Sequence, residues 1–121
     1  ELVKSIDLPW VQIGQAEART LEGVTRGVTG TFRGAMGWLS NCSLLVTTDG
    51  ALHHAAAALG KPAVVLWGGL APPQILGYDT HKNLCHASYW CGFNRPCDHC
   101  REAMSKITVD EVRGAILEMR S

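Results

Sequence analysis

The chain has 121 residues, a length that suits one modest domain. Its 11 acidic and 11 basic side chains balance, which argues against a nucleic-acid or anionic-membrane partner, and no apolar run approaches the roughly 20 residues that span a bilayer. Because 46% of the residues are hydrophobic and only 18% are charged, the chain can build a packed core.

The first third of the chain predicts a short helix, two extended segments and a longer helix. Residues 2–6 read as the end of a helix, and residues 10–14 are rich in strand formers and end at a Gly. Residues 22–30 predict a weak strand or an extended connection. Thr31 is the expected N-cap of the next helix, which ends at Asn41. The predicted apolar stripe of this helix consists of Phe32, Ala35, Met36 and Leu39.

Two apolar runs, residues 44–47 and residues 63–67, lack the polar alternation of half-exposed strands. They predict strands that are buried on both faces of a parallel sheet. A helix is expected between them, after Asp49. Gly60 supplies a left-handed stop for this helix, and Pro62 prevents its continuation. The predicted apolar face of the helix consists of Leu52, Ala55, Ala56 and Leu59.

The last third predicts an edge strand at residues 83–88, a cysteine-rich loop and a final helix. Thr108 and Glu111 form a capping box at the start of that helix. The apolar stripe of the helix consists of Val112, Ala115, Ile116 and Met119. Because strands alternate with helices, we predict an α/β fold, a Rossmann-like parallel sheet with flanking helices, whose ligands bind beyond the carboxyl ends of the strands. The residues expected at those ends are Gly14, Asp49 and Gly68.

The segment from residue 47 to residue 62 carries the strongest indication of function. A strand that feeds the N-terminus of a helix leaves backbone N–H groups unpaired, and these groups suit an anion such as a phosphate. Asp49, Gly50, His53 and His54 lie where such a ligand would be held. The alternative is that Asp49 only caps the helix and that the histidines are ordinary surface residues.

Residues 49–54, with the alanines, Gly60 and Pro62 that follow, resemble the signature of glycosyltransferase family 9, the ADP-heptose:lipopolysaccharide heptosyltransferases. The family's pattern places its Asp on Asp49 and its His on His54. Two positions depart from the pattern: Gly50 stands at a hydroxyl position, and Ala51 stands at a Gly whose turn geometry Ala tolerates poorly. Weaker similarity extends the resemblance from about residue 10 to the end. It involves residues 28–33, 67–69, 72–73 and the cysteine-containing tail from residue 97.

This resemblance implies the GT-B architecture, in which two Rossmann-like domains face each other. Residues 1–121 would be the C-terminal, donor-binding half of such an enzyme, truncated at its start and lacking the acceptor domain that carries the residue thought to act as catalytic base. The whole enzyme would move a heptose-like sugar from a nucleotide diphosphate donor to a lipopolysaccharide-type saccharide. It would work in the cytoplasm, peripherally at the inner membrane face, without a required cofactor. The isolated chain would be inactive.

None of the candidate binding residues is assigned a catalytic role. The backbone amides of Gly50 and Ala51 would stabilise the negative charge that develops on the leaving diphosphate, with His54 nearby as a hydrogen-bond donor or a positive charge. Asp49 would hold the turn or bind a sugar or ribose hydroxyl. Because a helix turns by about 100° per residue, His53 points away from His54 and is interpreted as a packing or surface residue.

Three further candidates lie outside this turn. The resemblance suggests that Gly30 and Thr31 flank the nucleotide base, and the alternative for Thr31 is ordinary N-capping. Glu17 follows the first predicted strand and would accept hydrogen bonds from ribose hydroxyls. The alternative for Glu17 is a solvated charge in a loop.

Four cysteines raise the question of a metal: Cys85, Cys91, Cys97 and Cys100. Four thiolates suffice for a structural zinc site, and the last two have the spacing of half a zinc knuckle. Reduced thiols packed against the loop are the alternative, and disulfides are the least expected state in a reducing compartment. A zinc site would suggest a rival function, a noncatalytic, zinc-stapled interaction module. A second rival is another GT-B enzyme such as a nucleotide-sugar epimerase, which an Asp-x-Gly-like turn with a downstream His does not exclude.

Overall fold

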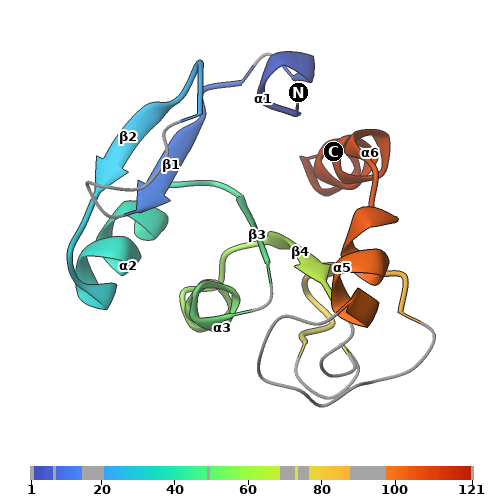
Figure 1. The fold of residues 1–121 in the computed structure, drawn as a ribbon. Coiled ribbons are helices and arrows are strands. Elements are labelled where there is room, and N and C mark those ends of the chain that lie inside the picture. Colours follow the sequence, from blue (N-terminus) through green and yellow to red (C-terminus); the bar gives the residue numbers. More distant parts are fainter. Residues whose placement is uncertain are drawn as a thin grey trace. The chain divides into compact units, whose positions relative to one another are not determined.

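The computed structural model describes residues 2–6, 8–14, 21–48, 50–68, 73, 77–87 and 98–120. The chain divides into two compact units, Glu1–Ser43 and Leu44–Ser121 (Figure 1). Helices and parallel strands alternate in both units, which confirms the predicted α/β class. The strands form two small sheets rather than one, so Gly14 ends a strand of the first sheet, whereas Gly68 follows a strand of the second. The GT-B architecture and the truncated start remain predictions.

The first unit contains α1 (Leu2–Ser5), β1 (Val11–Gly14), β2 (Thr25–Val28) and α2 (Phe32–Ser40). The two strands pair in parallel with Val11 opposite Thr25. The ring of Trp38, on α2, packs directly on the backbone of β2, because a Cβ atom added at Gly27 would lie 2.9 Å from Trp38 Cδ2. Gly27 therefore allows this helix to approach the strand closely.

Thr31 starts α2 as the sequence predicts. Its backbone is extended (φ −133°, ψ 154°), and its Oγ1 accepts a hydrogen bond of 3.0 Å from the Gly34 N–H. Asn41 caps the other end of the helix. Ala35 and Leu39 are buried, but Phe32 is 50% exposed, so the predicted stripe is wrong at its first position. Phe32 is the first residue of α2, so it lies at the exposed end of the stripe.

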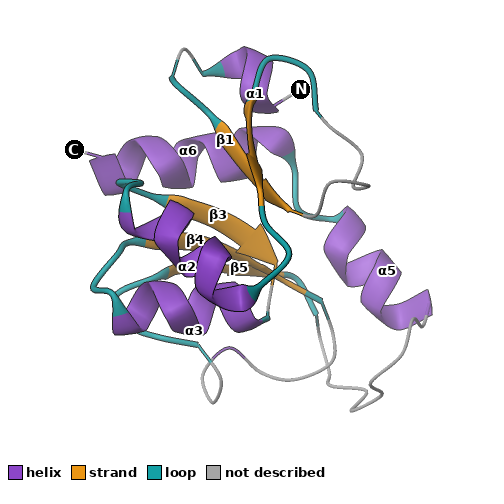
Figure 2. Cartoon of the chain, turned by 90° about the vertical axis from the view of Figure 1, so that its left-hand side faces the viewer, coloured by secondary structure: helices purple, strands orange, loops and turns teal. Residues whose placement is uncertain are grey.

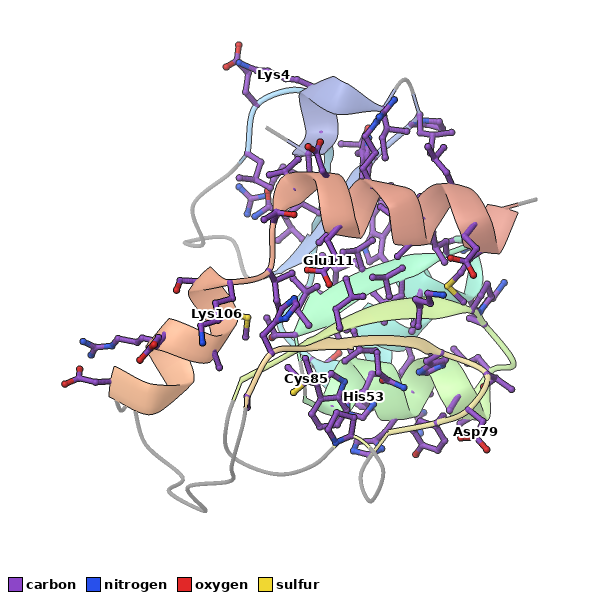
Figure 3. The ribbon with its side chains drawn as sticks, turned by 90° about the vertical axis from the view of Figure 1, so that its right-hand side faces the viewer. Lys4, His53, Asp79, Cys85, Lys106 and Glu111 are labelled. Atoms are coloured by element: carbon purple, nitrogen blue, oxygen red, sulfur yellow. The ribbon has the colours of Figure 1, made fainter. Side chains whose placement is uncertain are left out.

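The second unit is a sheet between helices. Its strands are β3 (Leu45–Thr48), β4 (Ala63–Trp67) and β5 (Lys82–Cys85), parallel and in the order β3-β4-β5. Figures 2 and 3 show α3 (Ala51–Ala58) on one face of this sheet and α6 (Val109–Arg120) on the opposite face. Four of the five residues of β4 are buried, as expected for a central strand covered on both sides.

The end of α3 is a Schellman motif. Gly60 has φ +69°, its N–H donates to the Ala57 carbonyl, and the Lys61 N–H donates to the Ala56 carbonyl at 2.8 Å. This confirms the predicted role of Gly60. The predicted apolar face is correct at Ala55 and Ala56, which are buried, but Leu59 is 38% exposed and His53 is fully buried in its place. The small alanines leave room for an imidazole on the sheet side of the helix.

The last two helices are α5 (Asp98–Ser105) and α6. Thr108 starts α6, because its Oγ1 accepts a hydrogen bond of 3.1 Å from the Glu111 N–H. The predicted stripe is confirmed, with Met119 half-buried and the other three residues, Val112, Ala115 and Ile116, buried. Helix α5 was not predicted; its residues fall in or just after the segment interpreted as a cysteine-rich loop. None of the described helices has the length and apolar character needed to cross a lipid bilayer.

Candidate functional site

The start of α3 lies directly after the carboxyl end of β3. Gly50 is the N-cap residue, with an extended backbone (φ 165°, ψ −166°), and no side chain caps the helix there. Gly50 and Ala51 are exposed, and a Cβ atom added at Gly50 would meet no described residue within 4 Å. Since the first N–H groups of a helix have no partner within it, the exposed start of α3 offers the kind of donors that an anion site at a helix N-terminus uses. Asp49, a predicted member of this site, lies outside the described residues.

The two departures from the family pattern at this turn cause no backbone strain. Ala51 is the first residue of the helix, and among the described residues no amino acid other than Gly has a positive φ. The backbone at Gly50 is extended, a conformation that any residue can adopt. The turn therefore forms without a left-handed residue at position 51.

His54 lies in the first turns of α3, and its side chain is exposed. Its Nδ1 is 2.7 Å from the hydroxyl oxygen of Tyr78, which is the distance of a short, well-formed hydrogen bond. Among the described residues, no hydrogen bond engages the other ring nitrogen of His54, Nε2. Nε2 is therefore the ring nitrogen left for a ligand by the described contacts.

His54 belongs to a group of rings that we call the histidine–aromatic cluster. Its members are His53, His54, Trp67, Tyr78 and His81. Figure 3 shows His53 between α3 and the sheet, where its ring centroid lies 3.9 Å from that of His54 and 5.5 Å from that of Trp67. The two histidines of the sequence motif thus touch each other, although one is buried and the other is exposed. The interpretation of His53 as a packing residue is consistent with its position.

His81 extends the cluster into the interior. The residue is only 7% exposed, and neither of its ring nitrogens has a hydrogen-bond partner of acceptable geometry among the described residues. Burial is the main cause that lowers the pKa of His81 below its ordinary value of 6.5, and the nearby His53 and His54 lower it further. The Lys61 backbone opposes this shift and raises the pKa of His81.

The remaining predicted binding residues do not all lie in the second unit. Gly30 is exposed, with open space where a Cβ atom would be, and Thr31 caps α2. Both belong to the first unit, whereas Gly50, Ala51 and His54 belong to the second. Glu17 lies outside the described residues.

Of the four cysteines that raised the question of a metal, Cys85 and Cys100 lie among the described residues. Cys85 is a free, half-buried thiol, 3.8 Å from the Gly68 carbonyl oxygen. Cys91 and Cys97 lie outside the described residues, and Cys100 lies in the first turn of α5. Within the described ranges, no group of three or more His, Cys, Asp or Glu side chains has the arrangement of a metal site. The predicted zinc site therefore remains a prediction.

Tyr78 and His81 were missed by the sequence reasoning. Both fall in a segment that reads as a loop, because its Pro and Gly residues obscure any period. A tyrosine and a histidine three residues apart, shortly before a strand, were the available signal. That signal indicates ring residues near the sheet but does not say which helix they contact.

Comparison with known proteins gives one match. The profile of the family described as glycosyltransferase family 9 (heptosyltransferase) matches residues 15–106, which is more than half of the chain. The matched range contains the start of α3 and all five residues of the histidine–aromatic cluster. Searches of curated proteins and of solved structures gave no match.

Proposed function

The chain belongs to glycosyltransferase family 9, and from this premise we propose that it binds the diphosphate of a nucleotide-sugar donor at the start of α3. The sugar would be heptose-like, as the family's description as heptosyltransferases suggests, and the nucleotide would be ADP, as the sequence resemblance implies. The acceptor would be a lipopolysaccharide-type saccharide. It would be held, together with the catalytic base, by a second domain, at the cytoplasmic face of the inner membrane.

The observation that carries this proposal is the open start of α3. When the glycosidic bond of the donor breaks, negative charge develops on the leaving diphosphate, and donors that are already in place there lower the barrier. Gly50 and Ala51 at the start of α3 are exposed, the first N–H groups of a helix lack partners within it, and the helix dipole adds the equivalent of roughly half a positive charge at this end. Nε2 of His54 adds a side-chain donor one turn further along.

The other predicted residues take roles that suit their charge. A carboxylate beside a diphosphate is repulsive, so Asp49 and Glu17 would accept hydrogen bonds from sugar or ribose hydroxyls. Gly30 and Thr31 would flank the nucleotide base. No cofactor is required in this scheme, because backbone amides and an imidazole supply the positive potential that a metal ion supplies in other transferases.

The amide contribution can be tested by removing one N–H group without removing the helix. Proline is tolerated at the first position of a helix, which Ala51 occupies, and the extended backbone of Gly50 is compatible with a following proline. We expect Ala51→Pro to weaken binding of ADP-heptose by about tenfold or more, because one hydrogen bond to a charged group is lost. Ala51→Ser, which keeps the N–H, is the matched control.

His54→Ala should also weaken donor binding, whereas His86→Ala should leave it unchanged, because His86 pairs with Glu111 of α6 on the opposite face of the sheet from α3. Isothermal titration with ADP-heptose and with UDP-sugars measures both effects and the nucleotide preference. Wild-type affinity in both Ala51→Pro and His54→Ala would exclude the start of α3 as the donor site.

A further inference from the structure

The hydrogen bond between Tyr78 and His54 suggests how the imidazole is prepared for the ligand. We propose that Tyr78 is a positioning residue that keeps a proton on Nε2 of His54, so that this nitrogen always donates toward the diphosphate. This inference rests on the proposed donor site. The Tyr78 hydroxyl lies 2.7 Å from Nδ1 of His54, and if its O–H donates to that nitrogen, the single proton of a neutral ring resides on Nε2.

The hydroxyl group is suited to this task because it both donates and accepts. With a neutral imidazole, the Tyr78 O–H donates to Nδ1, and the single ring proton resides on Nε2. With a protonated imidazole, Nδ1–H donates to the Tyr78 oxygen, and Nε2 again carries a proton. In both charge states Nε2–H faces the ligand as a donor. Without the hydroxyl, the neutral ring can place its proton on either nitrogen and can turn over.

A carboxylate in place of the hydroxyl would serve a diphosphate site less well, because its negative charge would repel the ligand. The titratable groups that face His54 among the described residues are Tyr78, His53 and His81, and none of them is a carboxylic acid. The described residues around the ring thus fix its orientation without adding a negative charge.

Tyr78 is itself held in place by the sheet. Its backbone carbonyl accepts a hydrogen bond of 3.1 Å from Nδ2 of Asn83, on β5, and Oδ1 of Asn83 accepts one of 3.0 Å from Nε1 of Trp67, on β4. The Tyr78 ring packs edge-on against His81, with 5.3 Å between centroids. These contacts hold the backbone and the ring of Tyr78 against two strands of the sheet, and they thereby fix the position of its hydroxyl group. A water molecule at the same place would have no such support.

Tyr78→Phe tests this inference, because it removes the hydroxyl and keeps the ring that packs on His81. With ADP as the probe, we expect about three- to tenfold weaker binding at about pH 8.5, where an imidazole is neutral. At about pH 5.5 the loss should be less than about twofold, since an imidazolium carries a proton on both nitrogens without help. In the His54→Ala background, Tyr78→Phe should have no effect at either pH.

The tautomer can be measured without any ligand from the nitrogen NMR shifts of His54. We expect a single Nε2–H form in the wild-type protein at about pH 8.5 and a mixture in Tyr78→Phe. An Nδ1–H form in the wild type would overturn the inference, and so would an equal loss of ADP binding from Tyr78→Phe with and without His54. The expected tautomers with no ADP binding at all would support the role of Tyr78 and contradict the donor site instead.

Discussion

At the scale of single residues, His81 connects the histidine–aromatic cluster to folding. Its ring is buried, and burial lowers its pKa in the folded protein. In the unfolded chain the same ring has an ordinary pKa of about 6.5. Between the lowered value and 6.5, the unfolded chain therefore binds more protons than the folded protein. The contribution of His81 to the free energy of unfolding therefore rises with pH across this window. The same contribution is lost as the pH falls through the window.

We predict that His81→Phe weakens this pH dependence. Phenylalanine keeps a ring against Tyr78 and cannot be protonated, so one contribution to the slope disappears; that contribution is at most about 1.4 kcal/mol per pH unit. Urea unfolding of both proteins between about pH 5 and pH 7.5 measures the slopes. If the free energies of unfolding of the two proteins change in parallel with pH, then His81 binds its proton as well in the folded protein as in the unfolded chain. His86→Phe, at a paired and exposed histidine, is the control.

At the scale of elements, Thr31 has one role that is observed and one that is proposed. Its side chain caps α2, and the family resemblance places it beside the nucleotide base. Serine supplies the same capping oxygen, whereas alanine supplies none. The pair of substitutions therefore separates helix stability from ligand contact.

We predict that Thr31→Ala lowers the free energy of unfolding by about 1 kcal/mol and that Thr31→Ser restores most of it. Chemical denaturation followed by circular dichroism measures this difference. If Thr31 also contacts the donor through its methyl group, Thr31→Ser will still bind ADP more weakly than the wild type. Equal unfolding energies for Ala and Ser would contradict the observed cap.

Most elements could be predicted from local patterns, because strands and helix ends in this chain carry their own signals. The buried runs of β3 and β4, the stop at Gly60 and the capping oxygens of Thr31 and Thr108 depend on neighbours in the sequence. Helix α5 could not be predicted in this way, since its sequence is mostly charged and polar and Ala103 is its one buried apolar residue among those described. Its ion pairs, such as Lys106 with Glu102, appear only once the helix exists.

The candidate site was predictable only where it is local. Gly50, Ala51 and His54 follow from the strand–turn–helix pattern and the family resemblance. The partner of His54 is Tyr78, more than twenty positions away, and their contact depends on how α3 packs on the sheet. The burial of His53 in place of Leu59 has the same origin, because tertiary packing decides which side of an alanine-rich helix faces inward.

At the scale of the whole molecule, the proposed donor site depends on amides and an imidazole for its positive potential. The chain carries no net charge at pH 7 with neutral histidines, so long-range attraction adds little. We therefore predict that chelation with EDTA changes ADP affinity by less than about twofold, since helix amides bind phosphate without a cation. Titration before and after chelation measures this. A loss that added magnesium restores would mean that a cation completes the site.

The order β3-β4-β5 has a consequence for protein synthesis. Each strand pairs with the next one along the chain, so the emerging polypeptide can add strands one after another as it leaves the ribosome. Helix α6 is made last, yet it covers the face of β4 and β5 opposite α3. Until translation passes residue 120, α6 is not available to cover this apolar face of the nascent sheet. During that time the face is accessible to chaperones.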